Sequence, residues 1–123
     1  MKKFVPAGER TTEHEMALLL LHYLPTKAYG AADLKTLFFE LPSFFAFTDK
    51  DREMSNSRRY EPKWHSVVRN IAAHADQPGN AIYDGLLVKW DKGKGGGYQL
   101  ASRAREVSNG RAARKHLRLS QAD

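Results

Sequence analysis

The sequence predicts an α+β fold with a three-helix core, a β-hairpin and one or more extra C-terminal helices. Two observations predict this class. Three segments in the first part of the chain carry apolar side chains at helical spacing. Residues 85–101 then form two strand-like apolar runs joined by a turn of Gly and Lys. A chain of 123 residues, 41% of them apolar, suits a single domain with one core of modest size.

The first predicted helix follows a segment, residues 1–11, that is expected to be a flexible arm. Thr12 and Glu15 have the spacing of a capping box, in which each residue bonds the backbone N–H of the other. The helix should continue to about Leu24, because Pro25 cannot extend it. The predicted core-facing side chains, which recur at i, i+3, i+4, i+7 and i+8, are Met16, Leu19, Leu20, Tyr23 and Leu24.

Two groups of apolar side chains need partners beyond this stripe. Leu18 and Leu21 widen the apolar surface of the first helix, so either the C-terminal tail or a second subunit should cover them. Phe44, Phe45 and Phe47 are too apolar for a free loop and should pack on the core.

The second predicted helix covers residues 34–41 and follows an extended link at residues 27–30. Asp33 can cap its beginning, and Pro42 ends it. Its predicted inward side chains are Leu34, Leu37, Phe38 and Leu41. Residues 48–51 can start a turn or a short helical piece.

The third predicted helix begins at Pro62, a residue tolerated in the first helical turn because its missing N–H has no partner there. Its predicted buried stripe is Trp64, Val67, Val68, Ile71, Ala72 and Ala75. The opposite face carries Lys63, Ser66, Arg69 and Asn70 and has no acidic side chain of its own. An ordinary solvated helix would mix Glu with Lys, so this face favours an acidic partner.

A β-hairpin should follow the third helix. Residues 85–90 and 98–101 are the predicted strands, and residues 91–97 are the turn, in which glycines permit a sharp reversal. The connection Asp76–Asp84 is longer than a simple turn and has no sequence explanation. Ser102 can cap a last helix.

The charge of the chain is uneven. The whole chain has 20 Lys and Arg against 14 Asp and Glu, a net charge of +6. Residues 1–57 contribute a net −1 and residues 58–123 a net +7. We therefore expect one domain at residues 12–108 and a basic helix or tail at residues 109–123, with nucleic acid as the first candidate partner.

Several classes of function are disfavoured. No Cys is present, and the five His lack metal-site spacing, so neither a metal nor another cofactor is expected. The glycine run lacks the spacing of a phosphate-binding loop, and Glu61-Pro62-Lys63 lies at a helix start rather than on the strand that an E-x-K nuclease motif requires. The sequence predicts a protein that is not an enzyme. With no apolar run long enough for a membrane span or a leader, a cytoplasmic location is expected.

The order of helix, short strand, two helices and basic hairpin is that of a winged helix-turn-helix, which predicts double-stranded DNA as the partner. The third helix would enter the major groove, and the hairpin, or wing, would contact the backbone beside it. The predicted groove contacts are Lys63, Ser66, Arg69 and Asn70. The predicted backbone contacts are Arg58, Arg59, Lys89, Lys92 and Lys94. The candidate base contacts are Trp90 and Tyr60, and Trp90 could equally pack beneath the wing.

Motifs distributed over half the chain carry a family resemblance. They are Thr48-Asp49-Lys50-Asp51, Trp64 with Val68 and Ala72, Gly85-Leu86-Leu87, Gly97-Tyr98-Gln99-Leu100 and Ser102-Arg103-Ala104-Arg105-Glu106. In this order they resemble the N-terminal winged-helix domain of Mrr-type restriction endonucleases. The family's nuclease domain has no counterpart here, so the resemblance implies DNA binding without cleavage. It also implies that an aromatic ring, such as that of Trp90 or Tyr60, could read methylated adenine.

Two alternatives remain. The apolar surplus at Leu18, Leu21 and the phenylalanine cluster favours a protein-interaction or dimerisation module of a regulatory or defence complex. The basic face would also suit structured RNA.

Overall fold

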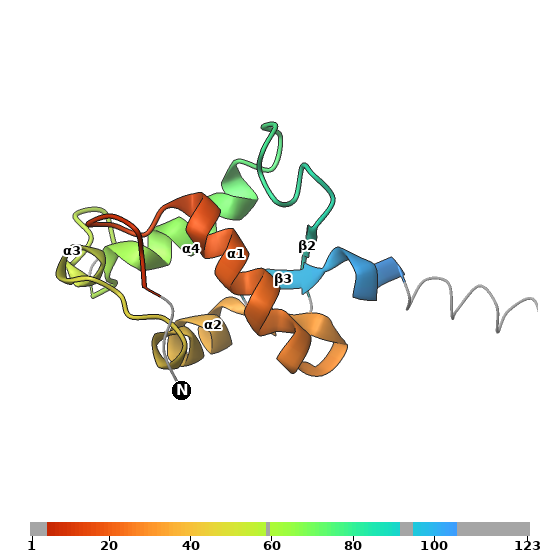
Figure 1. The fold of residues 1–123 in the computed structure, drawn as a ribbon, viewed down its shortest axis with the longest axis horizontal. Helices are drawn as coiled ribbons and strands as arrows, with labels where there is room; N and C mark the ends of the chain where they lie inside the picture. Colours follow the sequence, from red (N-terminus) through yellow and green to blue (C-terminus); the bar gives the residue numbers. More distant parts are fainter. Residues whose placement is uncertain (1–4, 59, 92–94, 106–123) are drawn as a thin grey trace, which may run out of the picture.

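The structure is a computed structural model that describes residues 5–58, 60–91 and 95–105, and it shows an α+β fold (Figure 1). The helices are α1 (Glu13–Tyr23), α2 (Leu34–Glu40), α3 (Asp49–Arg52) and α4 (Lys63–Ala73), and the strands are β1 (Ala31–Asp33), β2 (Leu87–Lys89) and β3 (Gly97–Leu100). Short 3-10 turns are η1 (Leu24–Thr26), η2 (Ala28–Gly30) and η3 (Leu41–Ser43). Residues 101–105 are helical. No described helix combines the length and hydropathy that crossing a membrane requires.

The three strands form one antiparallel sheet in the order β1-β3-β2. The return strand of the hairpin is therefore central, with Tyr98 paired to Ala32 on one side and to Lys89 on the other. Gly97 makes the β1 pairing possible, because a Cβ atom there would lie 2.3 Å from the Ala32 carbonyl oxygen. The hairpin is thus joined to the strand between α1 and α2.

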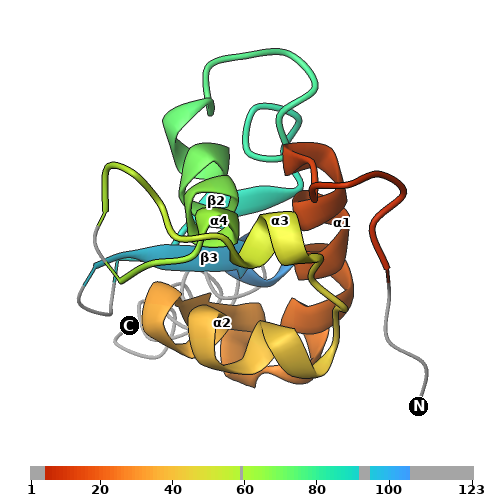
Figure 2. The ribbon, with the colours of Figure 1, turned by 90° about the vertical axis from the view of Figure 1, so that its left-hand side faces the viewer.

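The core lies between α1, α4, α2 and the central strand (Figure 2). Its fully buried side chains are Met16, Leu20, Leu24, Leu37, Leu41, Val68, Ile71, Leu87 and Tyr98. The Tyr98 hydroxyl donates to the Val68 carbonyl and accepts from the Ala72 N–H at 3.1 Å. Burial raises the pKa of Tyr98 to about 12. One side chain of β3 therefore joins the sheet to the backbone of α4.

The helix predictions are largely confirmed. Thr12 and Glu15 form the capping box of α1, Asp33 caps α2, and the predicted piece at residues 48–51 is α3. The third helix, α4, begins at Lys63, one residue later than predicted, with Pro62 as its extended N-cap. Phe45 and Phe47 are buried, and Phe44 packs against the core.

Two local predictions were wrong. Of the predicted extended link at residues 27–30, Lys27 alone is extended, and Ala28–Gly30 is the 3-10 turn η2, in which Tyr29 and Gly30 have positive φ, 61° and 60°. Ser102 does not cap the last helix, since the helical backbone already includes Ala101. The first predicted strand, residues 85–90, is shorter than expected, since β2 has three residues, whereas the second has its expected four residues and begins one residue earlier, at Gly97.

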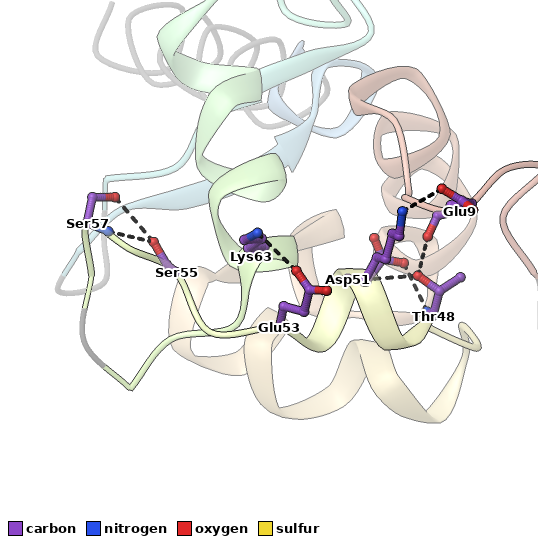
Figure 3. Close-up of polar contacts among 8 residues, drawn as sticks. Glu9, Thr48, Asp51, Glu53, Ser55, Ser57 and Lys63 are labelled. Carbon is purple, nitrogen blue, oxygen red and sulfur yellow. Dashed lines mark hydrogen bonds and ion pairs between the residues drawn. The ribbon is translucent and has the colours of Figure 1, made fainter.

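Part of the segment expected to be a flexible arm is held to the domain. Thr11 is buried, and its N–H and hydroxyl donate to the two carboxylate oxygens of Asp51 at 2.7 and 2.8 Å. Glu9 accepts from the Thr48 hydroxyl through its carbonyl and pairs with Lys50 through its carboxylate (Figure 3). The residues leading into α1 are thereby anchored to α3.

The connection Asp76–Asp84 folds around one buried amide side chain. Asn80 donates to the Ile71 carbonyl of α4 at 2.8 Å and accepts from the N–H groups of Ile82 and Tyr83 at 2.8 and 3.2 Å. This satisfies a carbonyl in the last turn of the helix. The long connection therefore ends α4 and directs the chain into β2.

Candidate nucleic-acid interface

A hollow of about 280 Å³ lies where α4, the loop before it and the hairpin meet. Each of these elements contributes one cation to its lining: Arg58 from the loop, Arg69 from α4 and Lys89 from β2. Asp91 and residues 95–97 form the hairpin side. Figure 2 shows the loop and the beginning of β3 at the same edge of the molecule. Residues far apart in the sequence thus form one basic surface.

Arg69 is the most restrained of these cations. Its guanidinium is paired with Glu61 at 2.7 Å and lies 5.1 Å from the centre of the Phe38 ring of α2. The two side chains of the pair are 28% and 25% exposed, and Arg69 Nε and Glu61 Oε2 are buried without a hydrogen bond within the described residues. Arg69 is therefore positioned beside the hollow by α2 and by a carboxylate.

Lys63 is also neutralised, in this case from the loop that precedes α4. Its ammonium pairs with Glu53 at 3.0 Å (Figure 3), and this contact lowers the pKa of Glu53. The face of α4 has no acid in its own sequence, but folding places Glu53 and Glu61 against its two cations. The prediction of a face free of acidic groups holds for the helix alone and must be corrected for the folded chain.

The four predicted groove contacts therefore separate into two pairs. Ser66 is half-buried and Asn70 is exposed, and no described side chain contacts the polar group of either residue. Lys63 and Arg69 are held in ion pairs. The neutral pair is ready to contact a ligand, whereas the charged pair would first exchange a carboxylate partner.

The loop before α4 is closed at its neck. Met54 and Pro62 form an antiparallel bridge, and the Lys63 N–H donates to the Glu53 carbonyl at 2.8 Å. Inside the loop, the Ser55 hydroxyl accepts from the N–H groups of Ser57 and Arg58, both at 3.2 Å. We call residues 54–62 the closed-neck loop. Its neck positions the loop relative to the first turn of α4.

Tyr60 lies within this loop in an unusual conformation. Its φ is 67°, a left-handed value that costs a residue with a Cβ atom about 1–2 kcal/mol. Its side chain is 88% exposed, and no described group bonds or stacks with it. Trp90 differs, because it is half-buried and its backbone N–H donates to the Gly97 carbonyl at 2.9 Å. Of the two candidate base contacts, Tyr60 has the free ring.

Several residues of this surface had no place among the predicted contacts. Phe38 stacks on His65 at 3.8 Å between ring centres, and burial lowers the pKa of His65. Glu53, Glu61 and Asp91 bring negative charge to the cations. The only sequence signal for the carboxylates was their proximity to the start of α4, which does not indicate a partner.

The described residues carry little of the net positive charge of the chain. The described residues include 11 Lys and Arg and 12 Asp and Glu, whereas the remaining residues hold nine basic and two acidic side chains. Three predicted backbone contacts, Arg59, Lys92 and Lys94, lie outside the described residues, as does the predicted basic tail at residues 109–123. The basic hollow is therefore a local feature of a folded region that is nearly neutral overall.

The described residues contain no group of three or more His, Cys, Asp or Glu side chains arranged to hold a metal ion. Comparison with protein-family models, curated proteins and solved structures found no match to this chain.

Proposed function

We propose that this chain is a winged-helix domain that binds duplex DNA without catalysing a reaction on it. The element order α1-β1-α2-α4-β2-β3 and the strand order β1-β3-β2 support the fold assignment. In this arrangement α4 is the recognition helix, and the β2–β3 hairpin is the wing beside it. The additional α3 and the closed-neck loop lie between the second and third core helices.

The observation that carries the proposal is the convergence of Arg58, Arg69 and Lys89 on one hollow from three separate elements. Glycines on the hairpin side leave the backbone accessible, so a phosphate group can approach it closely. A DNA strand following this edge would place a phosphate at the hollow and a groove over α4. Contacts to phosphate would set affinity and register.

Base reading would belong to the exposed face of α4. Asn70 has the donor and acceptor needed for a bidentate contact to adenine, and Ser66 can contact any base. Arg69 can contact guanine or a phosphate if the DNA replaces Glu61 as its partner. An aromatic ring at Tyr60 or Trp90 would be the means of reading a methylated adenine, as expected for a restriction-type or defence-type reader.

The proposal is tested by fluorescence anisotropy with a pool of blunt duplexes, unmethylated and adenine-methylated, at 50 and 200 mM salt. With about five phosphate contacts, affinity should fall about 500-fold over this range. Arg58→Ala should reduce the slope of log affinity against log salt by about 0.9. The matched control Arg52→Ala removes the same charge from α3, outside the hollow, and should leave the slope unchanged. If neither pool is bound at 50 mM salt, the proposal is wrong.

A second candidate function, protein interaction, is favoured by an apolar hollow of about 230 Å³ beside α1. It is lined by Val5, Leu18, Leu19 and Phe45 among others, with Leu18 45% exposed. The described residues leave Leu18 uncovered, as an unpartnered helix face would be. Sedimentation of the purified chain distinguishes the two: a dimer that Leu18→Glu converts to a monomer would support interaction, and a wild-type monomer that binds duplex DNA would favour the first function.

A further inference from the structure

The closed-neck loop contributes Arg58 to the lining of the hollow and, two residues later, carries an exposed aromatic ring that no described group uses for folding. Tyr60 has the most exposed ring among the large apolar side chains of the described residues, at 88%. Phe39 on α2 is nearly as exposed, at 85%, but it lies in a regular helix. Tyr29 also has a left-handed backbone and an exposed ring, with a φ of 61° and 61% exposure, but it is not among the residues lining the hollow, whereas Tyr60 follows Arg58, which lines it, by two residues. Such strain is typical of sites where a side chain is needed in one position.

The position of Tyr60 relative to Arg58 limits what the ring can contact. The Glu61 N–H donates to the Arg58 carbonyl at 3.3 Å, so Arg58 and Tyr60 belong to one turn, and their Cα atoms lie at most about 7 Å apart, the length of one nucleotide unit of a strand. Arg58 faces the hollow together with Arg69 and Lys89. A phosphate in the hollow would therefore place its own nucleotide, or the next one, within reach of the Tyr60 ring. The cation and the ring form two parts of one nucleotide-sized surface.

The chemistry of a tyrosine ring indicates whether the base of that nucleotide is paired or unpaired. A ring stacks on the flat face of a base, which is available only when the base has left the duplex stack. Bases inside an intact duplex show only their edges in the grooves. An exposed Tyr60 ring is thus poorly suited to paired bases and well suited to an unpaired one.

We propose that Tyr60 and Arg58 form a subsite for an unpaired deoxynucleotide next to the duplex, so that the domain prefers a duplex with a single-stranded overhang to a blunt one. This inference rests on the proposed DNA binding and adds a preference for strand ends or unpaired positions. Arg58 binds the phosphate on the hollow side, and Tyr60 stacks on the base. The closed neck keeps both at a constant distance from α4, which binds the adjoining duplex.

The test compares two labelled duplexes of equal paired length, one blunt and one carrying three unpaired deoxyadenosines, by fluorescence anisotropy at one salt concentration. The wild-type chain should bind the overhang duplex about tenfold more tightly, as expected for one stacked base. Tyr60→Gly removes the ring in a conformation that glycine adopts freely, so it should abolish the preference and lower the affinity for the overhang duplex to that for the blunt one. Tyr60→Phe keeps the ring and should keep the preference. Phe39→Ala removes an equally exposed ring from α2 and should have no effect.

The two duplexes separate this inference from the function on which it rests. Binding to the blunt duplex reports on the proposed DNA binding alone, and the difference between the duplexes reports on the subsite. Equal affinity of the wild-type chain for both duplexes would overturn the subsite while leaving DNA binding intact. An equal loss on both duplexes in Tyr60→Gly would overturn it as well. A larger gain from the corresponding RNA duplex and overhang would assign the partner to RNA and contradict the proposal as stated.

Discussion

The two sides of α4 are held by different kinds of interaction. Toward α1 and β3, Val68 and Ile71 have no exposed surface, and the Tyr98 hydroxyl bridges two backbone groups of the helix. Toward Glu53 and the closed-neck loop that follows it, the contacts are the ion pairs Lys63–Glu53 and Arg69–Glu61, which remain partly exposed.

Because of this difference, one side of α4 should determine the stability of the fold and the other side should determine the binding of DNA. Burial and neutral hydrogen bonds are insensitive to salt and have no competitor in solution. An exposed ion pair contributes little to folding, and a phosphate can replace its carboxylate. We therefore expect substitutions on the β3 side to change the free energy of unfolding and substitutions on the loop side to change the affinity for DNA.

The largest effect is expected for Gly97→Ala on the buried side. The added Cβ would lie 2.3 Å from the Ala32 carbonyl oxygen and 2.6 Å from the Asp33 Cα, both backbone atoms that cannot move independently. The pairing of β1 with β3 should be lost locally, at a cost of about 3 kcal/mol, which urea denaturation would measure. Gly95→Ala is the control, since its Cβ meets nothing within 4 Å and only its φ of 86° is unfavourable. Equal losses in the two variants would show that the close approach is unimportant.

A smaller loss is expected for Tyr98→Phe, which leaves the packing but removes the hydroxyl between Val68 and Ala72. The free energy of unfolding should fall by about 1–2 kcal/mol near pH 7. Tyr83→Phe, on an exposed ring, should be close to neutral. If the free energy of unfolding falls as little as it does for Tyr83→Phe, the Val68 carbonyl and the Ala72 N–H are satisfied without the hydroxyl.

The same residue predicts a pH dependence. Because the pKa of Tyr98 is raised to about 12 in the folded chain, the unfolded chain loses this proton first, from about pH 10. The contribution of Tyr98 should thus be complete below pH 10 and decline as the pH rises toward 12. The difference in unfolding free energy between wild type and Tyr98→Phe should narrow over that range. A constant difference would contradict the raised pKa.

The smallest effect on stability, with a gain in binding, is expected for Glu61→Gln on the loop side. Its side chain is a quarter exposed and its ion pair is partly solvated, so unfolding should change by less than about 1 kcal/mol. Releasing Arg69 toward the hollow should strengthen duplex binding at low salt severalfold. Asp49→Asn removes a carboxylate paired with Arg52 on α3 and serves as the control. Weaker binding by Glu61→Gln than by this control would show that the pair positions Arg69 rather than restrains it.

The predictions that succeeded concern features encoded over a few residues. The capping box at Thr12, the short helical piece that begins after Thr48, the Asp33 cap and the end of α1 near Pro25 all follow from neighbouring side chains. The turn at Tyr29 was missed because a tyrosine with positive φ has no local signal. The connection after α4 was unexplained because its anchor is Asn80, which bonds a carbonyl nine residues earlier.

The sequence alone determined the class of the fold and the type of each main element, because apolar periodicity, caps and glycine turns act within one or two helical turns. It also determined which residues of α4 are polar. Only the tertiary structure decided which side chains from other segments contact those polar residues. The path of the closed-neck loop brings Glu53 and Glu61 to the cations of α4, and strand pairing brings Lys89 to the hollow shared with Arg58 and Arg69. Partners of this kind depend on where distant segments cross, which no local pattern specifies.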